Sequence, residues 1–137
     1  DENSRQKFDF LNNNKSHLYK LGVDFYLNEK NTISFFTNQN IYDGKGYGTV
    51  AINYFNDPVR NLTQYFDDLS DNTSAQYNFD YKLDFGKEGH NIELEVDHNL
   101  FDSGQDADFR SVGAVVYPNY KDFVDTERTQ TTANLDY

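Results

Sequence analysis

Residues 73–101, TSAQYNFDYKLDFGKEGHNIELEVDHNLF, decide the fold. Apolar and polar residues alternate along both halves of this stretch, which is the period of a β-strand. Between the halves, Gly86 to Gly89 form a short polar turn with a glycine at each end. The pattern therefore predicts one antiparallel β-hairpin. Its expected apolar, lipid-facing residues are Tyr77, Phe79, Tyr81, Leu83, Phe85, Ile92, Leu94 and Val96.

The hairpin fits two environments. Each arm has about 10 to 11 residues, which exceeds an ordinary strand and matches the length of a tilted transmembrane strand. Aromatic side chains on one face and charged side chains on the other suit lipid on one side and a wet lumen on the other. A soluble antiparallel sheet with one solvated face gives the same alternation. The hairpin alone therefore leaves a membrane wall and a soluble sheet as alternatives.

Composition narrows the function classes. Aromatic residues make up 17% of the chain, but the hydrophobic fraction is only 36%, so β-forming bulk is present with little aliphatic filling for a compact interior. The net charge of -11 argues against a nucleic acid partner. The absence of cysteine excludes disulfides and thiolate metal sites. No apolar run reaches the roughly 18 residues of a helical span, so any membrane crossing is expected to be β-structure.

Similar alternation elsewhere predicts further strands. The expected strands cover about residues 17–27, 32–42, 74–85, 91–101 and 128–137, with long loops at about 43–72 and 102–127. Short turns thus alternate with long connections, which is typical of outer-membrane barrels. The opening DENSRQ and the final strand, which ends without a polar tail, are typical of a segment of a longer chain. The expected fold is an all-β, antiparallel, up-and-down transmembrane β-barrel segment of about five strands from a larger barrel, with short periplasmic turns and long outer loops.

Several segments resemble one protein family. Residues 19–35, YKLGVDFYLNEKNTISF, resemble the barrel segment of TonB-dependent-receptor-like outer-membrane β-barrel proteins of the Bacteroidetes type. Residues 77–85, 92–98 and 133–137 resemble further pieces of the same family, in the same order. The resemblance makes residues 1–137 a partial domain of a barrel of about 22 strands.

The same resemblance implies a location and a role. It implies the bacterial cell outer membrane, contact with outer-membrane lipid, and either substrate import or a structural role in an outer-membrane complex. It also implies that TonB and a surface lipoprotein are partners through parts that this chain does not contain. The role and the partners rest on the resemblance alone, because no single residue of the chain indicates them.

Chemical sites are few. Asp102, Asp106 and Asp108 are weak candidates for calcium, since their carboxylates could surround Gly104 in a loop, but no glutamate closes a 12-residue calcium loop. A solvated acidic loop is the alternative, and we expect no metal site. Several acids on one strand face, such as Glu93, indicate a wet lumen wall rather than the carboxylate pair of a glycosidase. We therefore expect no enzyme activity, no catalytic residue and no cofactor, and the sequence assigns no ligand-binding residue.

One alternative comes from another functional class. It is a soluble, secreted all-β binding module for a glycan or calcium, with a glycan held by aromatic loop residues. These residues would be Tyr47, Tyr54, Phe55, Tyr65 and Phe66. Dependence on detergent separates the two readings.

Overall fold

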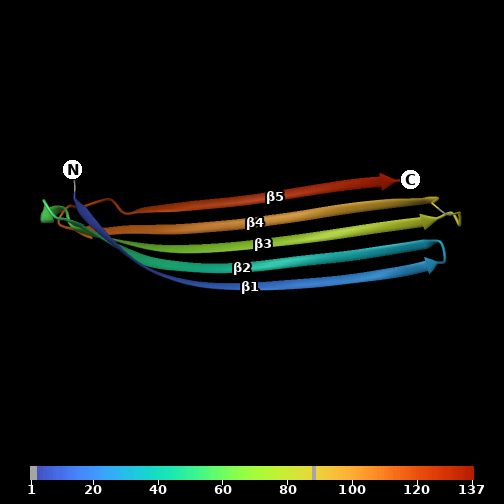
Figure 1. Cartoon of the computed structure of the whole chain (residues 1–137), viewed down its shortest axis with the longest axis horizontal. Helices are drawn as coiled ribbons and strands as arrows, with labels where there is room; N and C mark the ends of the chain where they lie inside the picture. Colours follow the sequence, from blue (N-terminus) through green and yellow to red (C-terminus); the bar gives the residue numbers. More distant parts are fainter. Residues whose placement is uncertain (1–2, 88) are drawn as a thin grey trace. The chain divides into compact units, whose positions relative to one another are not determined.

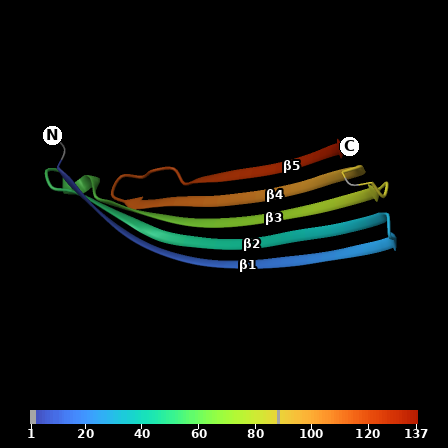
Figure 2. The same cartoon turned by 45° about the vertical axis from the view of Figure 1, so that its right-hand side comes forward.

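The protein forms one antiparallel sheet. The computed structural model describes residues 3–87 and 89–137. It contains a five-stranded sheet in which strands that follow one another in sequence are neighbours, as Figure 1 shows and Figure 2 repeats from another side. The elements are β1 (Ser4–Asn28), β2 (Asn31–Tyr54), the 3-10 helix η1 (Pro58–Arg60), β3 (Leu62–Asp84), β4 (Asn91–Gly113) and β5 (Tyr120–Asp136). The predicted all-β, up-and-down order is confirmed. Within the described residues β1 and β5 are edge strands, so the sheet is not closed.

The strands are longer than predicted. Strands β1 to β4 each contain 23 to 25 residues, and β5 contains 17. The long loops predicted at 43–72 and 102–127 are therefore wrong, because most of both segments is strand and only residues 55–61 and 114–119 connect strands there. The predicted strand limits at residues 17, 42, 74, 101 and 128 are wrong for the same reason. Glycines and charged residues hid the alternation, although exposed strands tolerate both.

The tight connections are built by side chains that accept backbone hydrogen bonds. Asn28 Oδ1 accepts from Lys30 N at 2.9 Å and from Asn31 Nδ2 at 2.8 Å. Asp84 Oδ1 accepts from Gly86 N at 2.7 Å, and Gly86 has a φ of 76°, which favours glycine. Glu88 of the predicted 86–89 turn lies outside the described residues, as do Asp1 and Glu2 of the predicted opening segment. Both connections, between β1 and β2 and between β3 and β4, thus lie at the positions that the sequence predicts for the two tight turns.

The chain divides into two compact units. The loop unit comprises the residues up to Lys15, Tyr42–Asp71 and Ser103–Asp125. The turn unit comprises Ser16–Ile41, Asn72–Asp102 and Thr126–Tyr137. No helix in residues 3–87 and 89–137 is long and apolar enough to cross a membrane.

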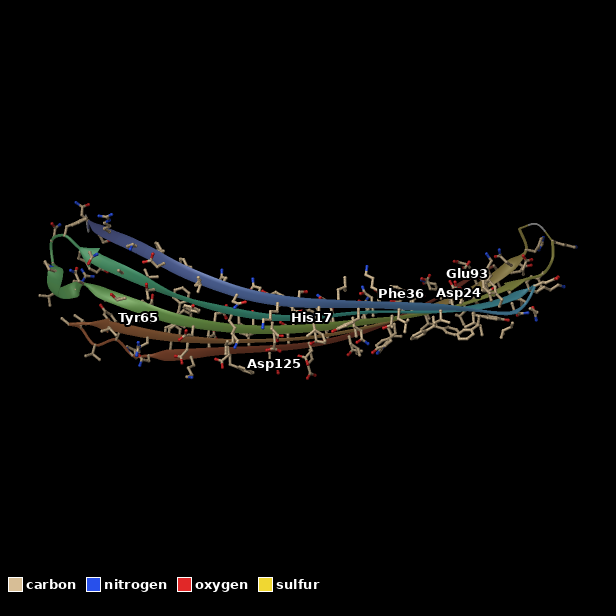
Figure 3. All side chains as sticks on the ribbon, turned by 90° about the horizontal axis from the view of Figure 1, so that it is seen from below. His17, Asp24, Phe36, Tyr65, Glu93 and Asp125 are labelled. Carbon is tan, nitrogen blue, oxygen red and sulfur yellow. The ribbon has the colours of Figure 1, made fainter. Side chains whose placement is uncertain are left out.

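Neither unit has a hydrophobic core within the described residues. Figure 3 shows side chains standing on both faces of the strands, including Glu93 in the turn unit and Tyr65 in the loop unit. Among the described positions, Gly44 alone is classed as buried, and it has no side chain. Cross-strand side-chain pairs and the backbone hydrogen-bond ladder therefore hold the sheet, rather than packing between layers.

Gly48 of β2 allows a side-chain contact between β1 and β3, which are not adjacent in the sheet. A Cβ atom at Gly48 of β2 would lie 2.6 Å from the Asp9 carbonyl oxygen and 2.7 Å from Phe66 Cζ. Without that atom, Phe10 of β1 and Phe66 of β3 meet above β2, with ring centroids 5.1 Å apart. At Gly22, by contrast, a Cβ atom would meet Phe36 Cδ2 at an ordinary 3.5 Å.

We expect Gly48→Ala to lower the free energy of unfolding by about 1 to 3 kcal/mol, because the methyl group overlaps a backbone oxygen and separates the two rings. Gly22→Ala is the matched control and should change it by less than about 0.5 kcal/mol, since the site has room. Urea unfolding followed by circular dichroism measures both. Equal losses for the two variants would contradict the ring contact across β2.

Candidate functional site

The polar face of the turn unit is organised by side-chain hydrogen bonds. Asn78 Nδ2 of β3 donates to Asp97 Oδ1 at 3.0 Å and to Glu95 Oε1 at 3.3 Å, both on β4. Ser16 Oγ donates to Asn40 Oδ1 at 3.1 Å between β1 and β2. One amide thus serves two carboxylates, which keeps like charges together on a half-buried strand face. The polar face needs contact with water.

The opposite, apolar face of the turn unit contains the residues predicted to face lipid. Seven of the eight lie on β3 and β4, and Phe85 follows the end of β3. None is buried, and Phe85 is 47% exposed. Two tyrosine hydroxyls on this face are paired: Tyr81 donates to Asn31 Oδ1 at 2.6 Å, and Tyr77 accepts from Gln39 Nε2 at 3.4 Å. Contact of this face with lipid stays a prediction.

The three weak candidates for calcium do not lie in a loop. Asp102, Asp106 and Asp108 lie on β4, where residues four apart are separated by about 13 Å, too far to share one ion. Asp108 instead pairs with Lys121 Nζ at 3.0 Å. The hydrogen bond from Lys121 to Asp108, together with the negative charges of Asp108 and Asp106, raises the pKa of Lys121. In the described part of the chain, no three His, Cys, Asp or Glu side chains gather closely enough to hold a metal.

The loop unit carries an aromatic row on one face. Its members are Phe8, Phe10, Phe66, Phe109 and Tyr120, which come from four strands. Ring centroids are 5.1 Å apart for Phe10 and Phe66, 6.4 Å for Phe66 and Phe109, and 4.5 Å for Phe109 and Tyr120. Phe66 was predicted to lie in a loop, and the aromatic row was not predicted from the sequence. The signal for the row is the spacing of the aromatic residues, which becomes visible only once the strands are in register.

A groove of the loop unit is lined mostly by residues of the other face, and also by Phe10, Phe66 and Tyr120 of the aromatic row. It has a volume of about 820 Å³ and crosses all five strands. The residues that matter below are Tyr47, Tyr65, Asp67, Asp108, Arg110 and Lys121. Tyr65, Asp108 and Lys121 each adjoin a member of the aromatic row in sequence, so their side chains stand on the opposite face. The Arg110 guanidinium carbon lies over the Tyr65 ring, 5.0 Å from its centroid.

Comparisons with known proteins do not assign a family. No family model matches the sequence. No curated protein matches it. Among solved structures, the chain is similar to the membrane pore complex of pneumolysin, with 13% identity and a TM-score of 0.23, over 97% of this chain and 31% of that one. The chain thus spans about a third of that protein, and so low a TM-score carries no conclusion about fold or function.

We expect Asn78→Asp to lower the free energy of unfolding by about 1 to 3 kcal/mol at pH 7, because it replaces a donor by a third carboxylate beside Glu95 and Asp97. Gln76→Glu is the control, since it adds the same charge on the same face of β3 but opposite neutral Asn99. It should cost less. Urea unfolding at pH 7 tests the difference, and equal losses for the two variants would contradict it.

Proposed function

We propose that the chain is part of the wall of a β-barrel in the bacterial outer membrane. In this proposal the apolar face of the turn unit contacts lipid and its polar face borders a water-filled lumen. One observation carries the proposal: the sheet is a single layer, and within the described residues nothing covers its apolar face. In water such a face would cost about 25 cal/mol for each Å² of exposed apolar surface, and lipid removes that cost.

Strand length and edges support the same conclusion. A tilted strand needs about 9 to 11 residues to cross the hydrocarbon region, and each of β1 to β4 has at least 23. The unpaired backbone groups of the β1 and β5 edges cannot remain open in lipid. In the proposed barrel they pair with neighbouring strands of the same wall, so the segment is incomplete without them.

The specific role rests on the family resemblance. We propose a TonB-dependent-receptor-like barrel that imports a substrate or serves as a structural subunit of an outer-membrane complex. TonB and a surface lipoprotein are its proposed partners, through other parts of the protein. What supports this proposal is the sequence of residues 19–35, 77–85, 92–98 and 133–137 together with the up-and-down order of the strands.

The soluble binding module is the second candidate, and the groove and aromatic row of the loop unit favour it. Such a module would need a cover for the apolar face of the turn unit. A module with such a cover would remain dispersed and folded without detergent, whereas a barrel wall would aggregate. Light scattering and circular dichroism in detergent-free buffer distinguish the two.

The two faces of β4 should differ in their tolerance of charge. We expect Leu94→Arg to destabilise the membrane-inserted protein by about 2 to 4 kcal/mol, because it places a cation against lipid. Glu93→Arg, one residue away on the polar face, should be tolerated. Glu93 is a cleaner control than Glu95, which accepts a hydrogen bond from Asn78. The measurement is the yield of heat-modifiable, folded protein in outer-membrane fractions, and a greater loss for Glu93→Arg would reverse the assignment of faces.

Sidedness provides a second test. The proposal places the connections of the turn unit on the periplasmic side, because they include the shortest one, residues 29–30, and short turns of such barrels face the periplasm. Single cysteines at Val59 and Val116, which are 65% and 92% exposed, should react with a membrane-impermeant maleimide on intact cells. A cysteine at Lys87 should react only after the outer membrane is opened. The chain has no native cysteine to confuse the labelling. Labelling of Lys87→Cys alone on intact cells would show the inverse topology.

A further inference from the structure

The groove of the loop unit contains two opposite charges that have no ionic partner among residues 3–87 and 89–137. Lys121 is engaged by Asp108 at 3.0 Å, and Lys7 by Asp9 at 3.3 Å. Asp67 makes no hydrogen bond or ion pair with another described residue. Arg110 contacts the ring of Tyr65 but no carboxylate in the described part of the chain. Among the residues that the structure describes, the groove therefore offers one free anion, Asp67, and one free cation, Arg110.

These two groups lie close together without meeting. Asp67 and Tyr65 are two residues apart on one face of β3, about 7 Å along the strand. The Arg110 guanidinium carbon lies over the ring of Tyr65, so the positive group is near Tyr65 and the negative group is two residues further along β3. They form no ion pair within 4 Å. One small molecule can reach both.

The neighbouring side chains suit a ligand with two charged ends. The N–H groups of a guanidinium bind a carboxylate in a fork, and among the described residues no carboxylate pairs with Arg110. On β2, Tyr47 lies opposite Asp67, since its neighbours Gly46 and Gly48 contact Asp68 and Phe66. Tyr47 is 51% exposed, so its ring can also contact a cation held by Asp67. The groove volume of about 820 Å³ lies in the usual range of small-molecule sites.

We propose that this groove binds a small zwitterion of about dipeptide length, with its carboxylate on Arg110 and its ammonium group on Asp67. A simple anion is a poorer fit because Asp9, Asp67 and Asp108 also line the groove. A simple cation is a poorer fit because it meets Arg110. Charge complementarity selects a ligand that carries both. All the residues involved belong to the loop unit, so the proposal holds for a barrel wall and for a soluble module alike.

The test uses the full chain, folded in detergent or buffer, and three probes: alanyl-alanine, its N-acetyl form and its C-terminal amide. Isothermal titration calorimetry should show binding of the free dipeptide. Each blocked form should bind about 10- to 100-fold more weakly, as expected for loss of one hydrogen-bonded charge. Equal binding of all three forms, or no binding to a chain whose β-sheet signal is intact, would overturn the proposal.

Two variants assign the ends of the ligand. With Asp67→Asn, N-acetylation should no longer weaken binding, while amidation still does. With Arg110→Gln the pattern should reverse. Asp125→Asn and Lys45→Gln alter charges of the loop unit outside the groove lining and should leave all three affinities unchanged. If Asp67→Asn and Arg110→Gln weakened every probe to the same extent, the two side chains would not bind separate ends and the proposal would fail. The labelling of Val59→Cys and Val116→Cys does not depend on the groove, so failure of one proposal does not imply failure of the other.

Discussion

Backbone hydrogen bonding between neighbouring strands is the interaction on which the whole structure depends. A protein with two packed layers can lose part of its ladder and keep its core, but the described residues of this chain contain no such core. The register of five long strands must therefore be fixed by turns and by pairs of side chains. The Asn28 and Asp84 side chains close the tight connections, and Asn78 links β3 to β4 on the polar face.

The two units use the same backbone pattern for different purposes. In the turn unit, apolar and polar residues occupy opposite faces of β3 and β4. In the loop unit, one face carries a row of aromatic rings and the other a groove with carboxylates, tyrosines and cations. The turn unit is therefore organised by the contrast between its two faces, whereas the loop unit is organised by its aromatic contacts and its charged groove.

The sequence predicted the existence, type and order of all five strands, because period-two alternation is strongest in the turn unit. It failed in the loop unit for reasons visible at particular residues. Gly44, Gly46 and Gly48 supply no side chains to one face of β2, and the acidic residues of β4 resemble a loop although an exposed strand accommodates them. The groove could not be predicted, because it depends on Tyr47, Asp67 and Arg110 being brought together by register between strands. The eight residues assigned to lipid followed from alternation alone, and their environment is still a prediction.

Gly48 also affects how the edge of the sheet can open. Strand β1 is an edge, and an edge bonded to one neighbour ordinarily frays one residue at a time. Here Phe10 of β1 reaches over β2 to Phe66 of β3, at 5.1 Å between centroids. Near Phe10, β1 cannot separate from β2 without also breaking the ring contact with β3, which is not its hydrogen-bonded neighbour among the described strands. Loss of this edge is therefore a concerted event that involves three strands, and a single missing methyl group makes it so.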